Sequence, residues 1–138
     1  MEKLKVYAPY DLSLIEEVSL RTADEMNVAI DRAYGLFEDR NNWLPKYKRV
    51  EILEKIASLM EERSEEIINT SAREGGKPYM DTKVEMARAI NGVKLAIENI
   101  GHFGGEEIPM GHTASSVNRL AFTMKEPIGV VASVSAFN

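Results

Sequence analysis

The last twelve residues constrain the fold of this chain more than any other stretch. Pro127 and Gly129 are followed by a nearly unbroken apolar run, residues 130–137, that is rich in β-branched valine. Such a run is typical of a strand buried on both faces, as in a parallel sheet covered by helices. A parallel strand needs a neighbouring strand reached through a crossover, usually a helix, and no crossover follows before Asn138. The sequence therefore predicts the front portion of a larger α/β protein, with an incomplete sheet.

The first hundred residues are predicted to be mainly helical. Thr22 and Glu25 have the spacing of a capping box, which marks the start of a helix. Apolar residues then recur at intervals of three and four, with a break near Ser64 and an end at Gly75-Gly76. A short hairpin is expected before these helices, over residues 4–19. The expected helices cover residues 22–39, 45–75 and 80–103.

The last third changes character, because glycines and prolines punctuate residues 101–111. Further on, Leu120, Phe122 and Met124 alternate with more polar neighbours. This period of two is typical of a half-exposed strand. On the pattern alone the segment reads as an ordinary edge strand.

Composition excludes several classes of function. The 138 residues are 44% hydrophobic and 28% charged, as in ordinary globular domains, and the formal net charge is −5. A negative balance without a basic stripe argues against nucleic acid or an anionic membrane as a partner. No apolar stretch reaches the length of a membrane span, and no secretory signal follows Met1. We therefore expect no nucleic acid and no membrane partner, and a cytoplasmic location.

Little in the chain suggests a metal or a phosphate loop. No cysteine is present, and His102 and His112 lack partners at the spacing of a metal site. No Gly-x-Gly-x-x-Gly occurs either. We expect no metal site in this chain.

Three stretches, in the same order and spacing, resemble the aldehyde dehydrogenase superfamily. Residues 126–131 and the closing Phe137-Asn138 are similar to that family's Glu-Pro-x-Gly-Val-Val and later Pro-Trp-Asn, with Ala136-Phe137 here in place of Pro-Trp. Residues 73–78 are similar to its Glu-Thr-Gly-Lys-Pro stretch, and residues 49–57 to the helix before it. The resemblance covers nearly all of the chain.

This resemblance implies both a fold and a reaction. Residues 1–138 would be the helical N-terminal portion of the NAD(P)-binding domain of an aldehyde dehydrogenase-like α/β fold, with the first core parallel strand. Residues 106–126 would include part of the β-hairpin that bridges subunits of a homodimer or homotetramer. The full-length protein would use NAD or NADP to oxidise a small aldehyde to an acid through a cysteine thioester. Since the chain contains no cysteine, the nucleophile lies outside it, as does the family's general-base Glu. The chain alone should be inactive.

The resemblance also assigns roles to the last residues. The amide of Asn138 would stabilise the oxyanion that develops during acyl transfer, although an Asn at a strand end is otherwise a common turn residue. Backbone and apolar contacts to the cofactor would come from Val134, Ser135, Ala136 and Phe137. An alternative from another class is a self-contained, mainly helical interaction or scaffold module without catalysis. The coding sequence beyond residue 138 would separate the two.

Overall fold

The structure is a computed structural model, and it describes residues 2–135. The chain begins with an antiparallel hairpin of β1 (Lys3–Tyr7) and β2 (Leu14–Ser19), as predicted. Four helices follow, α1 (Ala23–Glu38), α2 (Lys46–Glu62), α3 (Ser64–Gly75) and α4 (Tyr79–Ile100), and the short helix η1 (Arg40–Asn42) joins α1 to α2. The last part contains β3 (Glu107–Ile108), the short helix η2 (Ala114–Ser116) and β4 (Ala121–Phe122).

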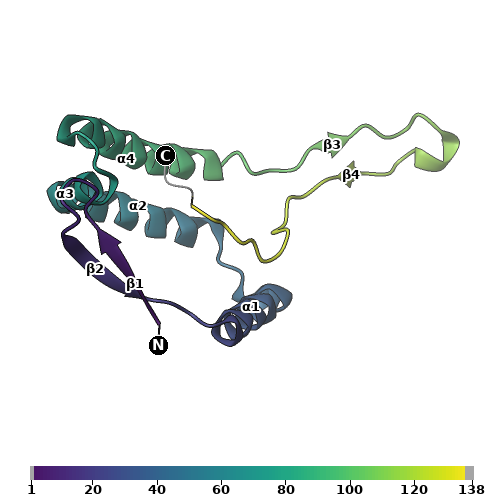
Figure 1. Ribbon diagram of the computed structural model, residues 1–138. Helices are drawn as coiled ribbons and strands as arrows, with labels where there is room; N and C mark the ends of the chain where they lie inside the picture. Colours follow the sequence, from purple (N-terminus) through teal and green to yellow (C-terminus); the bar gives the residue numbers. More distant parts are fainter. Residues whose placement is uncertain (1, 136–138) are drawn as a thin grey trace.

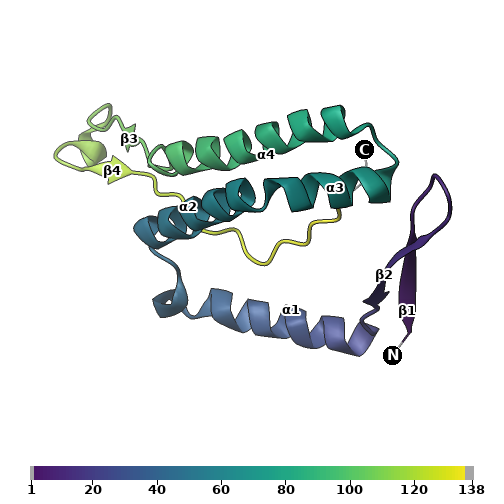
Figure 2. The ribbon, with the colours of Figure 1, turned by 90° about the vertical axis from the view of Figure 1, so that its left-hand side faces the viewer.

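Figures 1 and 2 show α4 lying over α2 and α3, with α1 set apart on the other side. The β3–β4 hairpin extends away from the end of α4 as an arm. The chain then returns, and residues 123–135 run between the α2–α3 layer and α1 (Figure 2).

Local sequence signals explain where the helices begin and end. The Thr22 hydroxyl accepts from the Glu25 N–H, and the Glu25 carboxylate accepts from the Thr22 N–H at 2.9 Å, so the predicted capping box is formed. Pro45 is the N-cap residue, just before the first residue of α2. The predicted break near Ser64 occurs at Arg63, between α2 and α3.

The end of α3 needs a glycine. Gly76 has a φ of +61°, the left-handed conformation that commonly closes a helix. A Cβ at this position would also lie 2.9 Å from the Pro9 ring. This contact places the turn of the β1–β2 hairpin against the end of α3.

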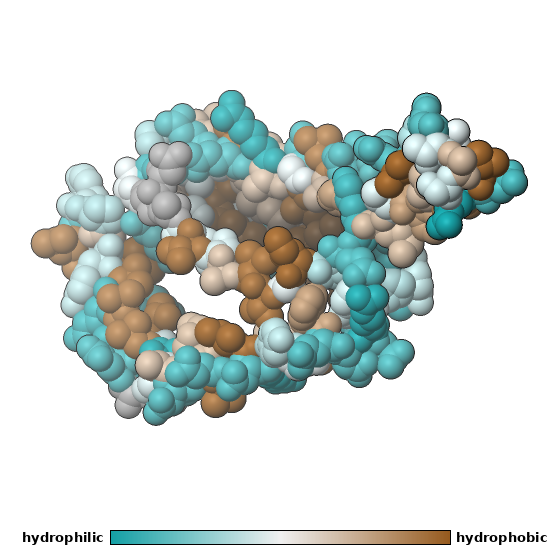
Figure 3. Space-filling model, turned by 90° about the vertical axis from the view of Figure 1, so that its right-hand side faces the viewer, coloured by the Kyte–Doolittle hydropathy of each residue, from teal (hydrophilic) through white to brown (hydrophobic). Residues whose placement is uncertain are grey.

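The core is small and lies between α2, α3 and α4. The buried apolar residues are Ala57, Ile68, Met86 and Ile100, with Ala8 beside the first hairpin. Helix α1 has no buried residue. Many large apolar side chains remain exposed, and Figure 3 shows hydrophobic residues gathered around a central hollow.

The arm has less regular strand than its alternation predicts. Only Glu107–Phe122 and Ile108–Ala121 pair, although the pattern favoured a strand over residues 119–125. Pro109 follows directly and has no N–H to extend the ladder. At the base of the arm, a Cβ on Gly105 would overlap the carbonyl oxygen of Thr123, so only glycine permits this close approach.

The buried parallel strand expected after Pro127 is not formed in the described residues. Residues 127–135 have no strand assignment, and Ile128 and Val134 are 91% and 93% exposed. A strand needs a neighbour to satisfy its backbone groups, and none lies beside this segment among residues 2–135. The structure is thus a mixed helix and strand fold with two small, incomplete sheets.

Candidate functional site

The predicted site residues lie at the end of the returning segment. Val134 and Ser135 are exposed and belong to no helix or strand. Ala136, Phe137 and Asn138 lie outside the described residues. The described part of the site region is the segment that leads to these residues, 126–135.

This segment starts from a cluster of side chains at the base of the arm. Arg40 of η1 donates two hydrogen bonds to Glu126, from Nη1 to Oε1 at 3.1 Å and from Nη2 to Oε2 at 3.0 Å. The Arg40 guanidinium also lies over the Trp43 ring, 5.1 Å from its centre. A two-point pair of this kind fixes orientation as well as distance.

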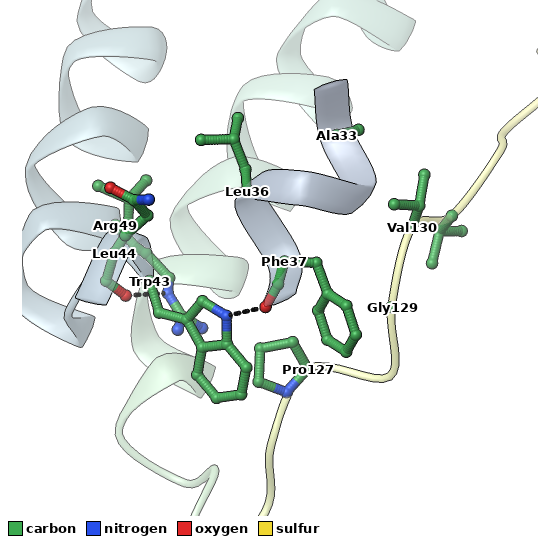
Figure 4. Close-up of a pocket in the computed structure, with 11 residues that line it drawn as sticks. Ala33, Leu36, Phe37, Trp43, Leu44, Arg49, Pro127, Gly129 and Val130 are labelled. Atoms are coloured by element: carbon green, nitrogen blue, oxygen red, sulfur yellow. Dashed lines mark hydrogen bonds between the residues drawn. The ribbon is translucent and has the colours of Figure 1, made fainter. Parts of the chain in front are cut away.

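Trp43 is itself held by the end of α1. Its ring stacks on Phe37 with centroids 6.0 Å apart and planes at 21°, and its Nε1–H donates to the Phe37 carbonyl at 2.8 Å. Figure 4 shows Pro127 beside these two rings. Pro127 thus lies beside the Trp43–Phe37 pair, and the Arg40 guanidinium lies over the Trp43 ring of the same pair.

The first residue of α2 contacts the other side of the arm. Lys46 Nζ donates to the Phe103 carbonyl at 2.7 Å. Lys125 Nζ lies 5.8 Å from the centre of the Phe103 ring. We call the group of side chains that make contact at the base of the arm the root cluster. Its members are Phe37, Arg40, Trp43, Lys46, Phe103, Lys125, Glu126 and Pro127.

An open, mainly apolar pocket of about 450 Å³ lies next to the root cluster. It is lined by the end of α1, residues 42–44 of the connector, Arg49 and the segment from Pro127 to Val131 (Figure 4). Arg49 Nε donates to the Leu44 carbonyl at 2.9 Å, which fixes the connector against α2. The pocket therefore borders the path of the segment that leads to Asn138.

The described part of the segment leaves apolar side chains and backbone groups uncovered. Residues 127–135 have no sheet partner within the part of the chain that the structure describes, so their backbone groups are not engaged in a ladder. The Val134 side chain is almost fully exposed. The cofactor contacts expected of Val134 and Ser135 stay a prediction.

Charged groups elsewhere form local pairs. Arg63 and Glu66, three residues apart, make a two-point pair at 2.9 and 2.6 Å, and this pair lowers the pKa of Glu66. Lys77 Nζ lies 3.0 Å from a Glu85 carboxylate oxygen.

Among residues 2–135, no group of three or more His, Cys, Asp or Glu side chains is placed to hold a metal ion. No helix in the same range is both long and apolar enough to cross a bilayer.

Sequence reasoning did not find the root cluster. Arg40 and Glu126 are 86 positions apart, and nothing in a single sequence pairs residues at that separation. Trp43, the chain's one tryptophan, was the available signal. A tryptophan ring buries a large area against its neighbours, and its N–H usually finds a hydrogen-bond partner.

Comparisons with known proteins agree with the motifs in the sequence. A model of the aldehyde dehydrogenase family matches residues 1–138. The chain is 35% identical over 137 residues to a 3-sulfolactaldehyde dehydrogenase of Priestia aryabhattai, covering 99% of this chain and 28% of that protein. It is 36% identical to a lactaldehyde dehydrogenase of Methanocaldococcus jannaschii, with the same coverage.

A solved structure gives the same result. A glyceraldehyde-3-phosphate dehydrogenase of Methanocaldococcus jannaschii, complexed with NADP, superposes with a TM-score of 0.79 at 35% identity. The match covers 92% of this chain and 26% of that one. The chain thus spans little more than a quarter of the length of these relatives. By the family match along its whole length, this chain belongs to the aldehyde dehydrogenase family.

Proposed function

We propose that this chain forms the N-terminal part of the cofactor-binding domain of an NAD(P)-dependent aldehyde dehydrogenase. The full-length protein would oxidise an aldehyde to a carboxylic acid through a cysteine thioester. The observation that carries the proposal is the family match along residues 1–138, which includes the motif ending at Asn138. Because the chain contains no cysteine, the 138 residues alone should have no activity. The cytoplasmic location expected from the sequence stays a prediction.

In this proposal the end of the chain carries two roles. NAD or NADP, when bound, supplies the acceptor for the hydride that leaves the substrate carbon. Val134, Ser135, Ala136 and Phe137 contact the cofactor through backbone and apolar groups and keep water from it. The Asn138 amide donates to the aldehyde oxygen, which gains negative charge as a thiolate attacks the carbonyl carbon.

We further propose a short 2-hydroxy aldehyde as substrate. Lactaldehyde, 3-sulfolactaldehyde and glyceraldehyde 3-phosphate, which appear in the names of the three relatives, all carry a hydroxyl group on the carbon next to the aldehyde. They differ at the third carbon, which bears hydrogen, sulfonate or phosphate ester. The 2-hydroxy aldehyde group that these molecules share supports the substrate class. The substituent on the third carbon differs among them, so the proposal does not specify it.

The arm, residues 106–126, is proposed to bridge subunits of a homodimer or homotetramer. Leu120 and Phe122 are 76% and 61% exposed, and Met124 is 72% exposed. Large apolar side chains on a projecting hairpin are characteristic of an interaction surface. Sedimentation of the full-length protein with Phe122→Lys should give a smaller species than the wild type, while Asn91→Lys on the outside of α4 should not.

The reaction can be tested on the protein encoded by the full reading frame. With NAD or NADP it should oxidise lactaldehyde or glyceraldehyde 3-phosphate faster than propanal, which lacks the 2-hydroxyl. Purified residues 1–138 should show no activity in the same assay. A well-folded full-length protein without any cofactor-dependent aldehyde oxidation would refute the proposal and favour the scaffold module.

Asn138 can be tested separately from the reaction class. Loss of one oxyanion donor typically lowers turnover by about 10²–10³. Asn138→Ala in the full-length enzyme should therefore lower kcat by that factor and leave cofactor dissociation nearly unchanged. Val134→Ala is the counterpart, since it should weaken cofactor binding more than turnover. Normal kcat in folded Asn138→Ala would remove the oxyanion role.

A further inference from the structure

The root cluster ties three distant parts of the chain together at one place. Lys46, the first residue of α2, donates to the Phe103 carbonyl at the start of the arm, at 2.7 Å. Arg40, in the connector between α1 and α2, pairs with Glu126 at the end of the arm, at 3.0 and 3.1 Å. Both sides of the arm therefore leave from the same support.

Arg40 is oriented before it meets Glu126. Its guanidinium lies over the Trp43 ring, and this ring is fixed by the stacking on Phe37 and by the bond from Nε1 to the Phe37 carbonyl. A planar guanidinium held on an aromatic face presents its two N–H groups in one direction. The carboxylate of Glu126 is consequently held in one place and one orientation.

The next residue passes this orientation on. Pro127 has a restricted φ because of its ring, and it lies beside Trp43 and Phe37 at the edge of the pocket (Figure 4). The point at which residues 127–135 leave the arm is therefore fixed at Glu126 and Pro127.

We propose that Arg40 is a positioning residue for the cofactor site, because its two-point pair with Glu126 fixes the start of residues 127–135, the segment that leads to the predicted site. The inference rests on the proposed function, in which residues 134–138 contact the cofactor and the aldehyde. Arg40 touches neither. It acts through Glu126 and Pro127.

The exposure of the pair limits the size of the effect. The side chains of Arg40 and Glu126 are 70% and 42% exposed. Exposed ion pairs have modest coupling, and a two-point pair lies at the upper end of that range, equivalent to about a two- to fivefold change in an equilibrium. Loss of Arg40 should therefore weaken cofactor binding about two- to fivefold rather than abolish activity.

The test uses the full-length enzyme with Arg40→Gln, Glu126→Gln and the double variant. Arg63→Gln is a matched control, because Arg63 and Glu66 form a two-point pair of similar exposure, 58% and 60%, between residues only three positions apart. The measurements are the dissociation constants of NAD and NADP, kcat, the melting temperature, and hydrogen exchange in the peptide covering residues 127–135.

Each single variant should raise the cofactor dissociation constant about two- to fivefold and speed exchange in residues 127–135. The double variant should be no worse than either single variant, because both remove the same interaction. Arg40→Lys keeps the charge but loses the two-point geometry, so it should fall between wild type and Arg40→Gln. Arg63→Gln should change neither binding nor exchange.

A purely structural role predicts a different result. If Arg40→Gln lowers only the melting temperature, with cofactor binding and exchange of residues 127–135 as in Arg63→Gln, the inference is wrong. Additive effects in the double variant would also overturn it. If the wild type binds neither NAD nor NADP, the proposed function fails, and the exchange rates alone decide whether Arg40 holds the segment.

Discussion

The exposed surface of this chain leads to a prediction about its behaviour in isolation. A compact monomer of 15.5 kDa is expected to expose about 7,200 Å². The structure exposes 11468 Å², an excess of about 4,300 Å² over that relation. A typical stable protein interface buries about 1,600 Å² in total, or about 800 Å² on each partner. The excess on this one chain is therefore about five times what one partner contributes to a standard interface.

This excess should drive self-association of the 138-residue chain. Ile128 and Val131 are 91% and 73% exposed in a segment whose backbone has no sheet partner among residues 2–135, and unpaired extended backbone with apolar side chains promotes edge-to-edge association. We expect oligomers in sedimentation velocity between about 10 and 100 µM, a range in which marginal chains with exposed apolar surface associate. We also expect strong binding of a hydrophobic dye.

Two substitutions test which surface is responsible. Ile128→Lys with Val131→Lys places two charges on the segment, so it should shift the chain toward monomer without loss of helical circular dichroism. Asn91→Lys adds a charge on the outer side of α4 and should leave the association unchanged. A wild-type chain that stays monomeric at 100 µM, melts in one sharp transition and binds no dye would refute the reasoning from exposed area.

Three further predictions concern the helices. Gly92 has no atom within 4 Å of where a Cβ would lie. Gly92→Ala should therefore stabilise α4 by up to about 1 kcal/mol and raise the melting temperature. A lower melting temperature would mean that another group packs against this position. Ile68 is 2% exposed, and Ile68→Ala should lower the free energy of unfolding by about 2 kcal/mol, the low end for a core deletion because so small a core can close around the gap. Ile52→Ala, at a 46% exposed position, should lower it clearly less in the same denaturant titration. Equal losses would contradict the assigned core. The Thr22 N–H, followed by Arg21, lowers the pKa of Glu25 below its ordinary 4.5, so the capping box stabilises α1 above about pH 4.5 and is lost as the pH falls through the lower folded pKa. Relative to the intrinsic rates, hydrogen exchange of the α1 amides should speed up over that range in the wild type but not in Glu25→Gln, which has no titrating group at this position.

Local signals were sufficient to predict the helices and the first hairpin. The capping box at Thr22, the break at Arg63 and the end of α3 at Gly76 each depend on residues a few positions apart. Gly92 is a counterexample. A glycine inside a helix costs stability and so suggests a close neighbour, but no atom lies within 4 Å of where its Cβ would be. Short-range patterns thus predict elements better than they predict contacts.

Features that depend on distant residues were not predicted. The valines after Pro127 have the composition of a buried strand, but pairing requires a neighbour that is absent from residues 2–135. The Arg40–Glu126 pair joins positions that no sequence period relates. For the site itself, the motif ending at Asn138 indicated which residues to test, whereas the support beneath it became visible only in three dimensions.

The distribution of buried residues also has a consequence for the order of folding. Four of the five buried apolar side chains belong to α2, α3 and α4, which follow one another between Lys46 and Ile100. Contacts that are close in sequence form fast, so this three-helix unit should collapse first, while the chain is still being synthesised. Helix α1 and residues 127–135 bury almost nothing on their own. They should stay accessible to chaperones until other surfaces cover them. We therefore expect these parts of the chain to become ordered last.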